Sequence, residues 1–494
     1  MKNLENLEIK NSFSQVGTDF FQAKSPDPVS SPYLINANPD TIELLGLDLS
    51  EIQNPKFVEY FSGNRLLPNS QPLAMAYSGH QFGSYNPRLG DGRGLLLGEI
   101  KDEQNNILDI HLKGCGPTRF ARGFDGRATL RASLREYLGG EAVHGLGIPT
   151  TRSLAVIGTG ELVHRETPEP GAILVRLSDS HIRFGSFQFF HFTNQPEKVT
   201  QLLDYIIKRH YPEIQNDPNK VKLLLRNVVK RTASLIALWQ ANGFIHGVMN
   251  TDNMTITGTT FDYGPFGFMD RFNPNFTPNH SDPHGRYAYG RQPEIGFWNL
   301  SKFGETISHL LDSKFIVEEL DNYQQIYNQS YRELMAQKLG LEILDSEFRE
   351  LVNQLFQLLY DNQIDYSLFF RHLSELPNNF SETLKQNFKN PQALDSWISM
   401  YLRLIEREDP SPATRKDKMN RINPKFILRN YLLQGAIDKA LKESDFSEVE
   451  RLRILLADPY TDRPELFSQL GIDPEFYASE TPTSFIEMQL SCSA

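Results

Sequence analysis

Three side chains that carry oxygen lie close together near the middle of the chain. Asp252 and Asn253 end the segment HGVMNTDN, and Asp262 stands in FDYG, an Asp-aromatic-Gly triplet. Carboxylate and amide oxygens are the ligands that Mg²⁺ prefers, usually together with substrate phosphates. We therefore expect Asn253 and Asp262 to hold a divalent metal ion and Asp252 to act as the base for an incoming hydroxyl group. Asp and Asn also favour turns, which is the purely structural alternative.

A lysine and a glutamate further upstream have the types needed to hold a phosphate. Apolar and polar side chains alternate in ILDIHLK, so Lys113 falls on the strand face opposite Ile110 and Leu112. Glu136 lies on a predicted helix but off its apolar stripe. It can hold the lysine in place, as the strand lysine and helix glutamate do in kinases. The alternative is a pair of unrelated surface charges.

Glycines and arginines would supply the remaining phosphate contacts. In RLGDGRG, Gly90 and Gly92 let the backbone approach a phosphate closely, and Arg93 can bind one in a bidentate manner. The same segment can also be an ordinary β-turn. Arg176 in a predicted strand and Arg183 in the loop after it would add the positive charge that a polyphosphate leaving group requires.

A sheet must position the lysine and the arginines. Strand patterns dominate up to about residue 183, and two of them flank the polar turn EQNN, which indicates a hairpin. The expected strands are 94–100, 107–113, 153–157 and 172–177.

Helices make up most of the rest. Asp125 is predicted to cap a helix that ends at Gly139-Gly140. A long helix is expected at 220–242, a short β-hairpin island at 254–261, and almost continuous helix after residue 300.

This order, β-rich and then helical, is the layout of a protein kinase, in which a nucleotide lies between a small sheet lobe and a large helical lobe. We predict an α+β, protein-kinase-like fold of two lobes. Its expected parts are an N-terminal arm packed on the core (1–85), a β-rich nucleotide-binding lobe (86–190), a mainly helical lobe with the catalytic and metal-binding loops (191–478) and a C-terminal tail (479–494).

Composition narrows the class of protein. A net charge of -11 over 494 residues argues against a role in coating nucleic acid, which needs a basic field. We see neither a signal-peptide pattern nor an apolar stretch of spanning length, and two cysteines suit a reducing compartment. We expect a cytoplasmic monomer that binds neither nucleic acid nor a membrane.

The chain resembles the selenoprotein O family over nearly its whole length. The resemblance is carried by five segments in order: YSGHQFGSYNPRLGDGRG (77–94), HLKGCGPTRFARGFDGRATLRASLREYL (111–138), HGVMNTDNMTITG (246–258), FDYGPFGFMD (261–270) and NHSDPHGRYAYGRQP (279–293).

The family resemblance implies a pseudokinase-like fold that binds ATP in a reversed orientation and transfers AMP, not phosphate, to hydroxyl side chains of proteins. It implies that Asp252 is the base, that Asn253 and Asp262 hold Mg²⁺ or Mn²⁺, and that Glu136 orients Lys113. The residues that would hold the nucleotide are Gly90, Gly92, Arg93, Lys113, Asp125, Gly126, Arg176 and Arg183.

Transfer of AMP would explain Arg176 and Arg183, because the departing pyrophosphate carries several negative charges that these arginines can stabilise. Asp252 and Asn253 are adjacent, whereas the usual kinase catalytic loop separates its Asp and Asn by several residues. Two alternatives stay open: a conventional kinase acting on a protein or small molecule, and a pseudokinase scaffold that only binds nucleotide. UTP as donor is a further alternative, because these residues do not read the base.

The two cysteines raise a separate question. Some members of the family end with selenocysteine three residues from the terminus, where SCSA places Cys492. A redox link to the loop after the Asp-aromatic-Gly triplet fits the family, but residues 262–293 contain no cysteine. We expect Cys115 and Cys492 to be free thiols, with a bridge between them as the alternative.

Overall fold

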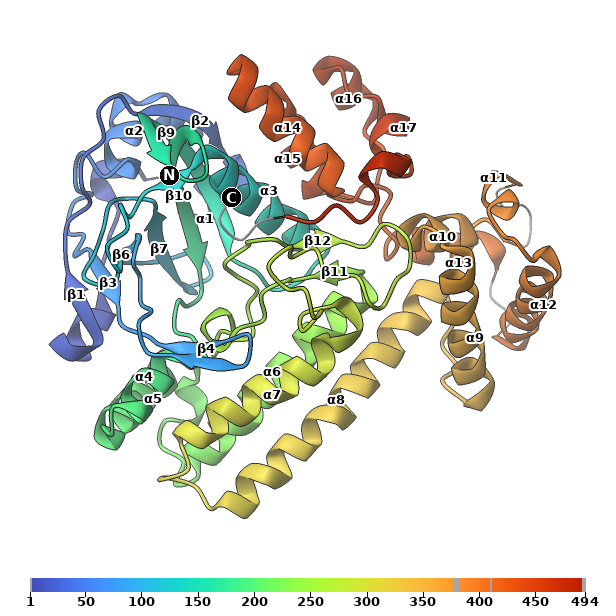
Figure 1. Cartoon of the computed structure of the whole chain (residues 1–494), viewed down its shortest axis with the longest axis horizontal. Coiled ribbons are helices and arrows are strands. Elements are labelled where there is room, and N and C mark those ends of the chain that lie inside the picture. The colour runs from blue at the N-terminus through green and yellow to red at the C-terminus, as the bar shows by residue number, and fades with distance from the viewer. Residues whose placement is uncertain (1, 377–381, 409–410, 491–494) are drawn as a thin grey trace.

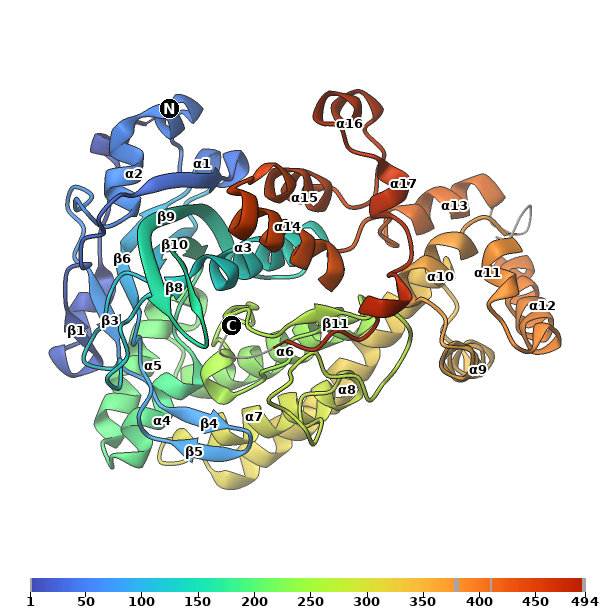
Figure 2. The same cartoon turned by 45° about the horizontal axis from the view of Figure 1, so that its top comes forward.

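The computed structural model describes residues 2–376, 382–408 and 411–490, which form an α+β structure (Figures 1 and 2). Cys492 lies outside the described residues. The strands are β1 (Phe21–Ala23), β2 (Tyr33–Ala37), β3 (Leu73–Met75), β4 (Gly79–Gln81), β5 (Ser84–Asn86), β6 (Gly94–Lys101), β7 (Ile107–Lys113), β8 (Ala128–Thr129), β9 (Arg152–His164), β10 (Pro168–Ser178), β11 (Phe244–Ile245) and β12 (Gly267–Phe268).

The helices follow mostly after residue 180. They are α1 (Pro39–Leu44), α2 (Pro55–Phe61), α3 (Leu130–Gly145), α4 (Phe184–Phe192), α5 (Pro196–His210), α6 (Lys220–Ala241), α7 (Gln292–Thr306), α8 (Ser313–Leu339), α9 (Ser346–Asn362), α10 (Tyr366–Leu373), α11 (Glu382–Gln386), α12 (Pro391–Glu408), α13 (Pro412–Asn420), α14 (Asn430–Glu443), α15 (Ser447–Ala457), α16 (Pro464–Leu470) and α17 (Pro474–Tyr477). The predicted helix at 220–242 and the helical character after residue 300 are confirmed.

An antiparallel sheet of eight strands carries the phosphate-binding candidates. Its order is β1-β3-β6-β7-β10-β9-β2, with β8 paired to β10, so strands from the first 85 residues extend both edges. The predicted hairpin is confirmed as β6 and β7, and the other two predicted strands are confirmed within β9 and β10. Leu174 lies opposite Lys113 and Arg176 lies opposite His111 in the register.

The two faces of the sheet have different tasks. One face packs on α1, α2 and the N-terminal segment through side chains such as Ile110, Leu112 and Val175. Lys113 and Arg176 belong to the opposite face. The alternation of apolar and polar residues in 107–113 had predicted this face for Lys113. On that opposite face α3 packs against β9 and β10. The helix bearing Glu136 therefore lies above the strands that bear the cations.

The predicted limits of α3 are wrong at both ends. Thr129, not Asp125, caps the helix by accepting a hydrogen bond from the backbone N–H of Ala132 at 3.2 Å. The helix also continues through Gly139 and Gly140. A Cβ at Gly139 would lie 2.6 Å from the Phe266 ring, so this glycine allows close packing and does not end the helix.

The predicted β-hairpin island at 254–261 is also wrong, because a turn occupies this segment. The Thr255 hydroxyl accepts a hydrogen bond from the N–H of Thr259 at 2.7 Å and donates to the Thr259 carbonyl at 2.9 Å. Gly258 supplies the positive φ of 74° that the turn needs. Threonine favours strands, but here its hydroxyl bonds to the local backbone, and the segment pairs with the rest of the chain through single bridges, Thr255 with Arg183 and Thr260 with Thr150.

The last helices return to the sheet. Figure 1 shows α14 and α15 beside α3, while α9 to α13 extend away on the other side. Apolar residues of α8, α9, α10 and α12 form a separate core cluster in that extension. No helix in the described part of the chain combines the length and the apolar character needed to cross a bilayer.

A glycine-to-alanine pair tests the contact between α3 and α15. A Cβ at Gly145 would lie 1.9 Å from the Leu456 carbonyl oxygen, so Gly145→Ala must push α15 away. We expect it to lower the free energy of unfolding by more than about 1 kcal/mol, although alanine favours helices. Gly435→Ala in α14 is the matched control, because no atom lies within 4 Å of its Cβ position. In urea unfolding, the Gly435→Ala control should be at least as stable as wild type. A Gly145→Ala variant as stable as wild type would show that α3 and α15 do not pack this closely.

Candidate active site

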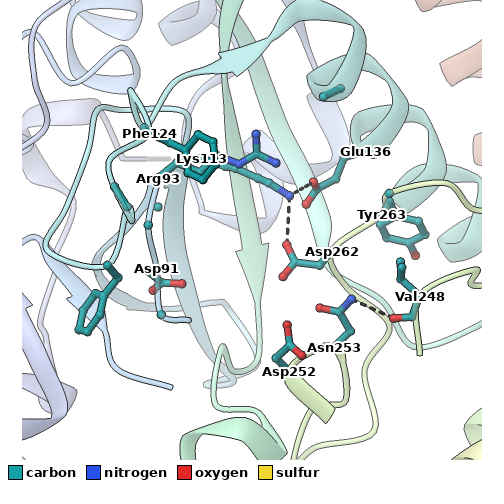
Figure 3. Close-up of a pocket in the computed structure, with 18 of the residues that line it drawn as sticks. Asp91, Arg93, Lys113, Phe124, Glu136, Val248, Asp252, Asn253, Asp262 and Tyr263 are labelled. Carbon is teal, nitrogen blue, oxygen red and sulfur yellow. Dashed lines mark hydrogen bonds and ion pairs between the residues drawn. The ribbon is translucent and has the colours of Figure 1, made fainter. Parts of the chain in front are cut away.

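A cleft of about 600 Å³ opens between the sheet with α3 and the loops that follow α6 (Figure 3). Its lining includes all twelve residues that the sequence singled out: Gly90, Gly92, Arg93, Lys113, Asp125, Gly126, Glu136, Arg176, Arg183, Asp252, Asn253 and Asp262. Segments from 90 to 262 in the sequence therefore meet in one place. Their individual roles stay predictions.

Asp262 is the meeting point of the cations in the cleft. Its Oδ1 accepts hydrogen bonds from Lys113 Nζ at 3.1 Å and from Arg176 Nη1 at 2.8 Å. Its Oδ2 accepts from Arg183 Nη1 at 3.1 Å. Burial on its own would raise the pKa of Asp262, but the three cations more than offset this and hold the pKa well below its usual range. Asp262 is therefore ionised at neutral pH.

The backbone of Asp262 is strained. Its φ of 57° lies in the left-handed region that non-glycine residues seldom adopt. Such a conformation costs on the order of 1–3 kcal/mol and persists only where the surroundings impose it. Here the three hydrogen-bonded cations supply that constraint.

Glu136 is the second anion of this network. Its contact with Lys113 is the one that the sequence predicted. Its Oε2 lies 2.5 Å from Lys113 Nζ and its Oε1 lies 2.9 Å from Arg176 Nη1, with the glutamate side chain only 2% exposed. Two carboxylates thus hold two cations on the floor of the cleft. These partners fix the lysine in position, which reduces the ordering cost of binding any anion there.

Arg183 is buried between aromatic rings at the base of the cleft. Its guanidinium lies 4.0 Å from the centre of the Tyr77 ring and 4.4 Å from that of Phe261. Nη1 also donates to the Asp252 carbonyl oxygen at 3.0 Å. The arginine therefore joins the backbone of one aspartate to the side chain of Asp262, which sets the spacing between the two candidate catalytic groups.

Asp252 differs from Asp262 in its electrostatics. Burial raises the pKa of the Asp252 carboxyl to about 6, although nearby Arg183 opposes the shift. Oδ2 accepts from Gln81 Nε2 at 3.2 Å, while Oδ1 is buried with no hydrogen-bond partner among the described residues. A weakly held carboxylate with a pKa near neutrality has the properties of a general base.

Asn253 is oriented by the backbone. Its Nδ2 donates to the Val248 carbonyl at 2.9 Å, which turns the amide oxygen toward Asp252 and Asp262 (Figure 3). Hard oxygen donors grouped in this way fit Mg²⁺ or Mn²⁺, with Asn253 and Asp262 as the candidate ligands.

The remaining candidates line the outer part of the cleft. Asp125 is exposed and forms a bidentate ion pair with Arg165 at 2.8 and 2.9 Å, instead of capping a helix. Arg93 is exposed beside it. At Gly126, φ is 66° and a Cβ would lie 2.1 Å from Pro117 N; at Gly90, a Cβ would lie 2.5 Å from the Phe120 ring. Both glycines are thus required by packing, whatever they bind.

Comparison with known proteins identifies the family of the chain. The family model described as "Protein adenylyltransferase SelO" matches residues 3–456. The chain belongs to the SelO family. Proteins named "Protein nucleotidyltransferase YdiU" from Myxococcus xanthus, Pseudomonas putida and Stutzerimonas stutzeri are 45%, 43% and 42% identical to it, and each alignment covers the whole of both chains. The predicted selenoprotein O resemblance is confirmed, and with it the enzyme class, a nucleotidyltransferase.

Several cleft residues of this SelO-family chain escaped the sequence analysis. Tyr77 packs on Arg183, and Asp91 lies 3.7 Å from the same guanidinium. Both belong to the first segment that carries the family resemblance, and this was the available signal. Arg135 donates to the carbonyls of Gly264 and Phe266, which ties α3 to the loop after Asp262. The only signal in the sequence for Arg135 was its position next to Glu136.

The charge of the cleft is opposite in sign to that of the chain. The protein carries a net charge of -11, yet its cleft is lined by eight cationic side chains and five carboxylates. His111 adds no charge at neutral pH, because burial lowers its pKa to about 3. The cations are Arg93, Lys113, Arg122, Arg127, Arg135, Arg165, Arg176 and Arg183, and the carboxylates are Asp91, Asp125, Glu136, Asp252 and Asp262.

Replacing each aspartate by asparagine should change stability in opposite directions. The raised pKa of Asp252 means that its ionisation favours the unfolded chain, so stability is lost as pH rises from about 4 to about 6. At pH 8, without metal or nucleotide, Asp252→Asn should raise the free energy of unfolding, by on the order of 2–3 kcal/mol. This gain should shrink toward pH 4.

Asp262→Asn is the matched comparison. The pKa of Asp262 is lower in the folded protein than in the unfolded chain, so its ionised carboxylate stabilises the folded state at neutral and higher pH, and this stabilisation is lost as pH falls. At pH 8 the free energy of unfolding of the variant should therefore be lower than that of wild type by more than about 1 kcal/mol. Asparagine tolerates the positive φ, so the backbone adds little to this loss. Urea unfolding in the presence of a chelator measures the free energy of unfolding of both variants. A change in the same direction for the two variants would contradict the assigned electrostatics.

Proposed function

We propose that this protein transfers AMP from ATP to Ser, Thr or Tyr hydroxyl groups of other proteins and releases pyrophosphate, with UTP as a second donor that delivers UMP. The observation that carries the proposal is the cationic cleft of an acidic protein, with Asp252, Asn253 and Asp262 together on its floor. Polyphosphate binding requires such a local charge, and the family description names adenylyl transfer to protein. The phosphate-binding residues do not read the base, which is why UTP belongs to the proposal.

The proposal includes a kinase-like arrangement of two lobes in a cytoplasmic monomer that binds neither nucleic acid nor a membrane. Its support is the cleft between the sheet with α3 and the loops after α6. In this scheme residues 86–190 form the nucleotide-binding lobe, 191–478 the helical lobe, 1–85 an arm and 479–494 a tail. The strands β1, β2 and β3 of the arm join the sheet of the first lobe.

Each group of residues has one task in the proposed reaction. Lys113, Arg176 and Arg183 would bind the phosphates, with Glu136 orienting the lysine. The outer contacts to the nucleotide would come from Gly90, Gly92, Arg93, Asp125 and Gly126. Asn253 and Asp262 would hold Mg²⁺ or Mn²⁺, which supplies charge neutralisation at the phosphates when bound.

The chemical step is a substitution at the α-phosphorus. An acceptor hydroxyl oxygen forms the new bond, the bond from the α-phosphorus to the oxygen bridging it to the β-phosphate breaks, and pyrophosphate leaves with that electron pair. Asp252 takes the hydroxyl proton, since its raised pKa of about 6 makes it a better proton acceptor than an ordinary aspartate. Arg176 and Arg183 stabilise the negative charge that develops on the leaving group.

Labelled ATP separates this reaction from a conventional kinase, which the Lys113–Glu136 pair at 2.5 Å would also serve. We expect label to reach protein from α-labelled ATP and not from γ-labelled ATP, in the presence of Mg²⁺ or Mn²⁺. Asp262→Ala should reduce the transfer at least about a hundredfold, because it removes a metal ligand and unpairs three cations. Asp395→Ala, at an exposed position on α12, is the matched control and should transfer normally.

Two other outcomes are distinct. Transfer from γ-labelled ATP alone would replace the proposal with a kinase. Binding of ATP without transfer of either label would leave the protein as a nucleotide-binding scaffold.

A further inference from the structure

The hairpin β4–β5 stands next to the candidate base, and its tip is unusual. The two residues that connect its strands, Phe82 and Gly83, both have positive φ, 51° and 85°. Two-residue hairpins of this kind favour Asn-Gly or Asp-Gly, because those residues adopt left-handed conformations at small cost. A phenylalanine at the first position is strained locally, and its side chain is also 43% exposed.

Neither folding nor solubility explains this residue. Its exposed ring contributes little to the core, and asparagine would suit the turn better. Residues that break local rules without a structural benefit are concentrated at functional sites. Phe82 also lines the catalytic cleft, so its exposed ring is continuous with the place where the reaction would occur.

The hairpin is rigidly attached to the loop that carries Asp252. The backbone N–H of His80 donates to the Thr251 hydroxyl at 2.7 Å, and the Gln81 amide donates to Asp252 itself at 3.2 Å. A Cβ at Gly79 would lie 2.6 Å from Asp252 Oδ1, so the strand approaches this side chain as closely as a backbone can. The tip therefore holds a constant position relative to the base.

The Phe82 ring has one aromatic neighbour that ties it to the same loop. Its centre lies 5.3 Å from that of Tyr287, and the Tyr287 hydroxyl accepts a hydrogen bond from the Phe82 N–H at 2.8 Å. The same hydroxyl donates to Asn250 Oδ1 at 2.6 Å. The Tyr287 ring is itself buried, so it supports the Phe82 ring, which alone forms a small, anchored apolar surface at the edge of the cleft.

We propose that the tip of the β4–β5 hairpin, with Phe82 as its main contact, is the docking point for the acceptor polypeptide, which places an apolar side chain on the Phe82 ring while the neighbouring hydroxyl reaches Asp252. This inference rests on the proposed function, because it assigns the acceptor side of the same cleft. An acceptor must lie beside the base, and the hairpin is the element whose side chain, Gln81, contacts that base.

Steady-state kinetics test the proposal. The acceptor probe is dephosphorylated casein, a largely unfolded protein rich in hydroxyl side chains, with α-labelled ATP as donor. Phe82→Asn suits the turn and removes the ring, so we expect the KM for casein to rise about tenfold while the KM for ATP changes less than about twofold. Phe82→Tyr should restore the wild-type KM. Phe476→Asn, which removes a different exposed ring (51% exposed), should leave both constants unchanged.

Two kinetic results would overturn the proposal. An unchanged KM for casein in Phe82→Asn would show that the ring does not bind the acceptor. A KM for ATP that rises by the same factor would assign the ring to the nucleotide. A thermal unfolding curve of each variant verifies that it is folded.

Photo-crosslinking keeps the docking test separate from catalysis. With p-benzoylphenylalanine at position 82, casein should crosslink in the presence of a non-hydrolysable ATP analogue, and the same group at position 476 should give only background. If wild type transferred no label, the proposed function would fail while crosslinking still decided the docking. A yield at position 82 equal to that at position 476 would reject it.

Discussion

The contact of Asp262 with three cations is the interaction on which the rest of the site depends. Lys113 comes from β7, Arg176 from β10 and Arg183 from the loop beyond β10, and each lies within 3.1 Å of the same carboxylate. Glu136 from α3 provides the second negative charge. Since a buried ion without its partner is strongly destabilising, the sheet, the helix and the loop that carries Asp262 stabilise one another. The geometry of the site is thus part of the stability of the fold.

Two aspartates of opposite electrostatic character follow from this arrangement. The cations hold Asp262 ionised, as its proposed role as a metal ligand requires, whereas burial raises the pKa of Asp252 to about 6, as suits its proposed role as a base. Separated pKa values of this kind assign different chemical tasks to identical side chains. The cost is borne by the fold, because Asp252 is buried without full hydrogen bonding and Asp262 has a strained φ. Both features lower the free energy of unfolding at the positions proposed to carry the chemistry.

The sequence predicted the features that depend on local patterns and missed those that depend on packing. Alternation in 107–113 placed Lys113 on the correct face, because the strand period is a local property. Gly139 was wrongly expected to end α3, because its real neighbour, Phe266, is distant in sequence. The same reason hid Tyr77, whose role comes only from its contact with Arg183. The candidate residues that line the cleft could be singled out because their types and motifs are local features of the sequence; the side chains that pack on them could not.

The two sides of the cleft solve different physical problems. On the proposed phosphate side, charges fixed on strands suit a ligand that would always be a polyphosphate, so rigidity there costs no versatility. In the proposed reaction, the acceptor side must admit different polypeptides yet present each hydroxyl to Asp252 at one distance. A hairpin bonded through His80 to Thr251 would meet both demands, since its proposed docking tip can receive varied apolar contacts while its strands are attached to the loop that carries Asp252. A mobile loop in its place would have to be ordered in each turnover, and part of the binding energy would be lost to that ordering.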